Sequence, residues 1–352
     1  MLLPFKVLLS LRLMVLLVFL VLGGKIVQAQ LFPAITDSPT VYAPDLLHWP
    51  TDAASQLPDL TEPTSNRIYD LHMKVGNCEA FGLIISTGGN YHMALTEYWY
   101  QDFLKKYPVS NWYFSTSPPI SPEQVANDHL GFSNITLACP PHVAIGPKSI
   151  MDSLVANGFA AEEPIPLFTN YGNVLLVRKG NPKQIFTLAD LARPDVRVAT
   201  SNPYTETKSF GNYAQSIFQM ALAQQDSNYA QQLFDDVFNS GSGKWIVGKR
   251  IHHREVPHLI YADQADVAPL FYHLAQYMVA TFPETFEVVP LGGTVEAPDP
   301  LPGNKRGKFF VVPIKTSLTD AQQQYRAGFL AEIRAGIFDP YLEKHFLIPA
   351  KR

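Results

Sequence analysis

Hydrophobic positions along this chain come in short apolar runs, each followed by a polar turn and a helical period. The clearest example starts at residues 81–85 (FGLII), an apolar run that predicts a buried strand. It ends in the small polar turn 86–90 (STGGN), and a helical repeat of apolar residues then continues to Pro108. A turn of this kind leaves free backbone N–H groups at a helix start, where anions bind. The alternative is an ordinary strand-to-helix turn with a good N-cap.

The same pattern repeats to the end of the chain and predicts an α/β fold with mainly parallel sheets. We expect strands at residues 111–117, 142–146, 173–177, 196–200, 266–271, 287–290 and 308–313. We expect helices at residues 122–129, 148–157, 188–192, 210–224, 319–334 and 339–345, and one that follows His258 and ends near Ala262. Residues 166–171 are interpreted as a segment that crosses between two lobes.

The predicted elements fall into two lobes, each a mainly parallel sheet flanked by helices, with a ligand cleft between them. The second lobe is expected at residues 173–280. The first is expected to combine residues 68–172 with residues 281–352. In open α/β sheets ligands bind outside the carboxyl ends of the strands, so small polar turns at those ends in both lobes predict a cleft.

Residues 1–29 have the pattern of a cleaved signal peptide. Lys6 and Arg12 precede an apolar run of about ten residues, and small residues follow before position 30. The alternative, a membrane anchor, needs roughly 20 apolar residues. No cysteine stands at the cleavage point to carry a lipid. We therefore expect a periplasmic or secreted protein, in which residues 30–67, rich in Pro and Asp, form a tether.

Charge and motifs narrow the functional class. Cleavage after Ala29 removes three of the 27 basic residues and no acidic ones, which leaves 24 − 31 = −7. No basic stripe suited to nucleic acid is present, and no catalytic, phosphate-loop or zinc-protease motif stands out. The sequence favours a monomeric binding protein without a cofactor and not an enzyme. An acidic protein still binds an anion where the donors are local and neutral.

Three stretches resemble type II periplasmic binding proteins, especially their molybdate-binding branch. They are residues 177–182 (VRKGNP), 188–198 (LADLARPDVRV) and 265–272 (ADVAPLFY). The resemblance implies a receptor that delivers a small oxyanion to the membrane component of an ABC transporter by cleft closure. Matched to this sequence, the ligand positions of the family fall on Thr87, Gly89, Asn90, Tyr91, Ser115, Thr116, Ser117, Asn202, Thr205 and Tyr272.

The chain also departs from the family pattern at several of these positions. Gly89-Asn90-Tyr91 replaces the usual Ser-Leu of the first turn, and two prolines follow Ser117. A charged segment, residues 251–255 (IHHRE), replaces a less charged one in the second lobe. These departures indicate a divergent subfamily with an unassigned solute.

The charged segment permits three interpretations. His253 and Arg254 could contact an anion. His252, His253 and Glu255, with Tyr272, could instead bind a metal ion or metal chelate, because imidazole and carboxylate are common metal ligands. In the third interpretation the segment is a solvated helix start with Arg254 and Glu255 as surface charges.

Cys78 and Cys139 are the only cysteines. In an exported protein such a pair suggests one disulfide, and the alternative is two buried thiols. The sheet order implied by the family resemblance makes the strands that follow these cysteines parallel neighbours. Both cysteines would then lie at the amino edge of the first sheet, within reach of each other.

Overall fold

The computed structural model describes residues 33–42, 70–73, 81–88, 90–109, 111–117, 122–126, 130–132, 135–137, 140–249 and 252–352. Residues 37–352 form one compact unit, and residues 33–36 carry no regular secondary structure. The predicted signal peptide, most of the predicted tether, Gly89, Cys78 and Cys139 lie outside the described residues. In the part of the chain that is described, no helix is both long enough and apolar enough to cross a membrane.

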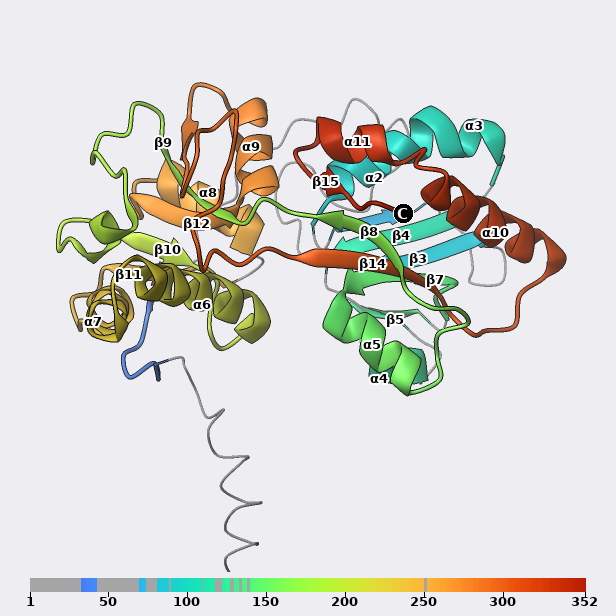
Figure 1. The fold of residues 1–352 in the computed structure, drawn as a ribbon, viewed down its shortest axis with the longest axis horizontal. Coiled ribbons are helices and arrows are strands. Elements are labelled where there is room, and N and C mark those ends of the chain that lie inside the picture. Colours follow the sequence, from blue (N-terminus) through green and yellow to red (C-terminus); the bar gives the residue numbers. More distant parts are fainter. Residues whose placement is uncertain are drawn as a thin grey trace, which may run out of the picture. The chain divides into compact units, whose positions relative to one another are not determined.

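The first sheet has seven strands in the order β15-β8-β14-β7-β3-β4-β2 (Figure 1). β3 runs parallel to β7, with Ile85 opposite Val143, so the expected neighbour relation of these two strands is confirmed. The C-terminal part of the chain completes the sheet, because β14 lies antiparallel between β7 and β8. The bounds are β2 Asp70–Met73, β3 Leu83–Thr87, β4 Trp112–Ser117, β7 Val143–Pro147, β8 Ile165–Thr169, β14 Lys308–Pro313 and β15 Ile348–Pro349.

Aromatic side chains fill the core of this first lobe. Trp99 stacks on Phe103 with ring centroids 4.6 Å apart and meets Trp112 edge-on at 5.4 Å. Trp99 and Phe103 lie on one helical stretch that continues through a π-helical turn, whereas Trp112 starts β4. The buried face predicted from the period of this helix is confirmed. The helical segments are α2 His92–Tyr98, η2 Trp99–Phe103, α3 Leu104–Lys106, α4 Pro122–Ala126, α5 Lys148–Ala156, α10 Asp320–Arg334 and α11 Asp339–Lys344, and a small hairpin joins β5 Leu130–Phe132 to β6 Ile135–Leu137.

The second sheet has six strands in the order β1-β11-β10-β12-β9-β13. β1, β11, β10 and β12 are parallel, whereas β9 runs antiparallel to both β12 and β13. β1 comes from the segment predicted as a tether and adds an edge strand beside β11. The bounds are β1 Thr40–Val41, β9 Asn173–Arg178, β10 Val198–Thr200, β11 Trp245–Val247, β12 Val267–Phe271 and β13 Phe286–Val289.

Helices cover the second sheet, and three details differ from the sequence prediction. α8 begins at His252 and contains Pro257, whereas we expected a helix only after His258. α7 and α9 were not predicted. α7 is capped by Asp226, whose carboxylate accepts from the Tyr229 N–H at 2.9 Å. The bounds are η3 Leu188–Ala192, α6 Thr207–Gln224, α7 Ser227–Phe238, α8 His252–Tyr261 and α9 Tyr272–Thr281.

Within the described residues, two chain segments connect the sheets, and two asparagines tie these segments together. Asn170, after β8, accepts from the backbone N–H groups of Gly172 and Gly307 at 3.1 and 2.9 Å. Asn304, before β14, accepts from the Asn173 N–H at 2.7 Å and donates to the Asn173 carbonyl at 2.8 Å. These bonds satisfy buried backbone groups where the chain leaves the sheets, so the two crossings form one hydrogen-bonded pair. Figure 1 shows the two crossings running between the sheets.

Candidate functional site

The charged helix α8 is buried along almost its whole length. Residues 252–260 are all buried, and Arg254 and Glu255 are each only 1% exposed. α8 packs on β9, β10 and β12 of the second sheet. The interpretation of Arg254 and Glu255 as surface charges is therefore wrong. A buried guanidinium is costly unless hydrogen-bonded and charge-compensated, which marks this helix as a candidate site.

Arg254 joins the second lobe to the first. Its Nη2 lies 3.1 Å from Nε2 of His92, which starts α2, and both side chains are buried. Guanidinium nitrogens only donate, so Nε2 of His92 must accept and the His92 ring is neutral in this contact. The ring also meets Tyr277 of α9 edge-on at 5.5 Å. A fixed positive charge thus lies where α2, α8 and α9 meet.

A partly buried carboxyl group stands at the start of α8. Glu206 Oε2 accepts from the His252 N–H at 3.0 Å. Burial, reinforced by the nearby Glu255, raises the pKa of Glu206 to about 8, although the His252 N–H opposes the shift. The Glu255 carboxylate lies against Gly248, where an added Cβ would be 2.1 Å from Oε2. Because its pKa is about 8, Glu206 is mostly protonated at neutral pH and adds little negative charge beside α8.

The turn after β10 supplies a hydroxyl that the sequence analysis did not select. Ser201 is buried, and its Oγ has no hydrogen-bond partner among the described residues. Asn202 follows it, but this side chain already donates to the Gly248 carbonyl at 3.1 Å and accepts from the Tyr204 N–H at 2.9 Å. Thr205 is exposed. Of this turn, Ser201 is the residue best placed to bind a ligand.

The turn after β3 uses most of its polar groups internally. Thr87 Oγ1 lies 2.7 Å from the Tyr91 hydroxyl and 3.2 Å from the Gly88 carbonyl, so the hydrogens of both hydroxyls are engaged. Tyr91 is fully buried and its ring packs edge-on against Phe168 at 4.8 Å. We therefore assign Thr87 and Tyr91 to the core and remove them from the ligand set.

Asn90 is the member of this turn that keeps a free group. Its backbone has φ 55°, the left-handed region that Asn tolerates better than most residues. Its Oδ1 is buried without a partner among the described residues. Ser115, Thr116 and Ser117 end strand β4, but their side chains lie outside the described part of the structure.

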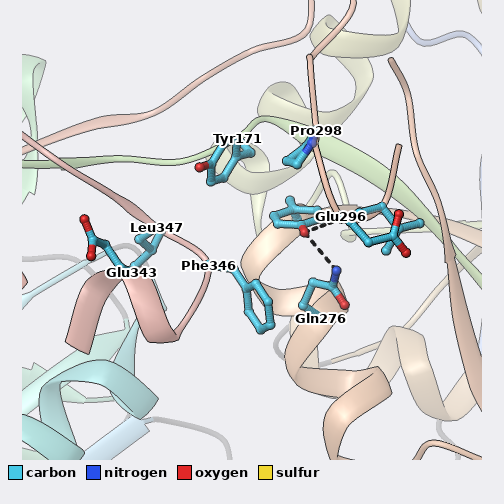
Figure 2. Close-up of a pocket in the computed structure, with 9 residues that line it drawn as sticks. Tyr171, Gln276, Glu296, Pro298, Glu343, Phe346 and Leu347 are labelled. Carbon is cyan, nitrogen blue, oxygen red and sulfur yellow. Dashed lines mark hydrogen bonds between the residues drawn. The ribbon is translucent and has the colours of Figure 1, made fainter. Parts of the chain in front are cut away.

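The Tyr272 hydroxyl has no hydrogen left to donate to an anion. Its hydroxyl donates to the Val295 carbonyl at 2.5 Å and accepts from Gln276 Nε2 at 2.9 Å (Figure 2). A phenol carries one hydrogen, so the expected donor role toward an oxyanion is not available in this arrangement.

A metal centre on α8 finds no support in the geometry. His252 Nε2 lies 3.1 Å from the Pro269 carbonyl and must donate to it, and burial lowers the pKa of His252 to about 3. His252 and His253 are adjacent on a helix, so their side chains do not face each other. Among the described residues, no three His, Cys, Asp or Glu side chains are grouped as they would be to hold a metal ion.

Sequence reasoning missed Ser201, His92 and Glu206. Ser201 was recognisable as the first residue after the predicted strand 196–200, where a small polar turn begins. His92 and Glu206 gave no such signal, because their roles depend on contacts with α8 that span 162 and 46 residues.

The two sheets, their flanking helices and the paired crossings define a two-lobe α/β binding protein of the periplasmic type, and the expected fold class is confirmed. Residues 137–319 match the family model for bacterial extracellular solute-binding proteins. This is just over half of the 352 residues, and the chain belongs to that family.

Solved structures support the fold at low sequence identity. The sulfate-binding protein SubI from Mycobacterium tuberculosis H37Rv is 15% identical, with a TM-score of 0.53, 76% of this chain covered and 87% of that chain. A periplasmic thiamin binding protein is 12% identical, with a TM-score of 0.50, 77% of this chain covered and 83% of that chain. At these identities the likeness concerns the fold alone. The comparison with curated proteins found no match.

Proposed function

We propose that this protein is an exported receptor that binds a small, molybdate-like oxyanion and passes it to the membrane component of an ABC transporter. The observation that carries the proposal is the buried Arg254, which extends from α8 to His92 of the first lobe. An oxyanion placed here would accept charge-assisted hydrogen bonds from the guanidinium. Family membership supports the receptor class, and the pattern of residues 1–29 supports export to the periplasm or medium.

Neutral polar groups complete the proposed site. Ser201 Oγ and Asn90 Oδ1 are buried atoms that lack a partner among the described residues. The Ser201 hydroxyl can donate to an anion through its hydrogen and the Asn90 amide through Nδ2, and neither introduces a charge that must be desolvated. Because Asn90 and His92 belong to the first lobe and Ser201 and Arg254 to the second, the anion would hold both lobes, and closure would follow from binding.

A thermal-shift panel of the mature protein tests the ligand class. Molybdate, tungstate, sulfate and phosphate are compared with divalent metals and thiamine at equal ionic strength. A ligand at 100 times its Kd adds about 2.7 kcal/mol to the free energy of unfolding. Stabilisation by at least one oxyanion is expected. If metals or thiamine stabilise and no oxyanion does, the proposed ligand class is wrong.

Arg254→Lys, with Arg326→Ala as a control, tests the site. Arg326 is a partly buried arginine of the first lobe that donates to the Ile314 carbonyl at 2.8 Å. Lysine keeps the charge but loses the fork of donors, so weaker oxyanion binding is expected for Arg254→Lys and unchanged binding for Arg326→Ala. Equal affinity in Arg254→Lys and wild type would place the site elsewhere.

A further inference from the structure

A cavity of about 660 Å³ lies beside α9 and does not share a lining residue with the Arg254 region. Figure 2 shows the side chains that line it. The lining comes from the crossing after β8, from α9, from the loop after β13 and from the chain around the end of α11. The lining residues are Tyr171, Tyr272, Gln276, Val295, Glu296, Pro298, Glu343, Phe346 and Leu347.

Three aromatic rings form the walls of this cavity. Tyr171 meets Tyr272 at 5.4 Å with an interplanar angle of 71°, and Tyr272 meets Phe346 at 5.8 Å with an angle of 87°. The two hydrogen bonds of the Tyr272 hydroxyl, to Val295 and Gln276, hold the central ring in place. All three rings line the cavity and stand at steep angles to their neighbours, so a cation inside it would meet aromatic surface on more than one side.

The charged lining residues have one sign. Glu296 and Glu343 are acidic and exposed, and the nine lining residues include no Lys, Arg or His. The two glutamates lie on opposite sides of the aromatic group in Figure 2. Carboxylates at the rim raise the local concentration of cations and oppose the entry of anions. The cavity therefore has the opposite preference to the Arg254 region.

Phe346 occupies a position where glycine would be less strained. Its φ is 62°, and it follows the end of α11 in a Schellman turn. The Phe346 N–H donates to the Glu343 carbonyl at 3.0 Å, and the Leu347 N–H donates to the Leu342 carbonyl at 2.9 Å. A bulky residue at this left-handed position is strained, and Phe346 is also 36% exposed. Strain of this kind often persists at ligand sites.

We propose that this cavity binds a small organic cation with an alkylammonium group. The methylated or methylene-bearing nitrogen would lie against the faces of Tyr171, Tyr272 and Phe346, and Glu296 and Glu343 would supply the counter-charge at the rim. The lining of this cavity shares no residue with the proposed oxyanion site, and the proposal does not depend on that site.

Calorimetric titration with tetramethylammonium and with choline tests the proposal, with sodium chloride as the ionic-strength control. Saturable binding is expected for wild type. Phe346→Gly removes one aromatic wall and relieves the backbone, so binding should weaken about tenfold without a large fall in Tm. Gln184→Gly is the matched control, because Gln184 also has a positive φ of 52° but lies outside the cavity lining.

Two further variants make the test decisive. Glu296→Gln combined with Glu343→Gln should weaken binding of the cation and reduce its dependence on salt. Arg254→Ala should leave cation affinity unchanged. The proposal is overturned if neither cation binds wild type saturably, if Phe346→Gly binds as wild type does, or if Arg254→Ala abolishes binding.

Discussion

The turns after β3 and β10 have the same sequence character and different fates in the structure. Both are small and polar, and both lie at the carboxyl end of a parallel strand. After β3, the hydroxyls of Thr87 and Tyr91 bond to each other inside the core. After β10, Ser201 Oγ is buried without a partner among the described residues, and the charged α8 packs against this strand. Similar turns therefore do not imply similar binding roles.

The difference arises from the residues that follow each turn. Tyr91 is aromatic and is drawn into the core against Phe168 and Phe338. Its hydroxyl needs a partner there, and Thr87 supplies it. The second turn contains Pro203 and the exposed Tyr204, and neither places a buried hydroxyl that would need Ser201 as its partner. The binding capacity is thus expected mainly on the second lobe, with Asn90 and His92 as the contribution of the first.

The largest effect on oxyanion binding is expected for Arg254→Ala. Removal of a charge-assisted contact should cost about 3 kcal/mol of binding free energy, or more than a hundredfold in Kd for the best oxyanion. Calorimetry on wild type, Arg254→Ala and Arg326→Ala measures it. A loss shared equally by both variants would reflect general destabilisation and would contradict a specific role.

The second prediction concerns the pH dependence of stability near α8. The pKa of Glu206 is about 8 in the folded protein against 4.5 for the free side chain. The folded state therefore holds a proton that the unfolded state releases between these values. Consequently the contribution of Glu206 to the free energy of unfolding falls as pH rises from about 4.5 to 8.

Glu206→Gln keeps the shape of the side chain without the titration. In urea unfolding from pH 5 to pH 9, the difference in free energy of unfolding, variant minus wild type, should rise with pH. The rise should amount to a few kcal/mol at most, because one pKa unit corresponds to about 1.4 kcal/mol. A difference that stays flat over this range would show that Glu206 titrates normally.

Tyr91→Phe should separate stability from binding in the first lobe. The variant leaves the Thr87 hydroxyl without its partner in the core and should lower the free energy of unfolding by about 1–2 kcal/mol. Oxyanion affinity should not change. Tyr204→Phe is the control, because Tyr204 is 69% exposed and its hydroxyl should contribute little. Weaker binding in Tyr91→Phe would return this turn to the ligand set.

The smallest effect is expected within the turn after β10. Ser201→Ala should weaken oxyanion binding by about 1 kcal/mol, close to fivefold, because one neutral hydrogen bond is lost. Stability without ligand should hold or rise, since the Ser201 hydroxyl makes no bond among the described residues. Thr205→Ala is the matched control on an exposed residue. If Thr205→Ala proved the more harmful, the ligand would lie further along the turn.

Much of the fold follows from local pattern. Long apolar runs such as those of β9 and β14, and amphipathic helices such as α6 and α10, were predicted close to their observed bounds. Short elements were less predictable. β11 is only three residues long, and its pairing with β1 and β10 stabilises it more than any propensity of its own. α9 starts directly after β12 with no intervening loop or side-chain cap, so no boundary signal preceded it.

The sequence by itself determined the α/β class and the polar turns at strand ends, because these depend on the spacing of apolar residues. The neighbouring parallel strands of the first lobe were implied by the family resemblance. Only the tertiary structure decided which polar groups remain available. One of the three interpretations made Arg254 and Glu255 surface charges, because the sequence of a charged segment alone does not show whether it is buried. Their burial depends on packing against residues far away in the chain, and Arg254 contacts His92 across 162 positions. Tertiary packing also places the hydroxyls of Thr87 and Tyr91 within hydrogen-bonding distance of each other. The Ser201 hydroxyl, by contrast, has no hydrogen-bond partner among the described residues.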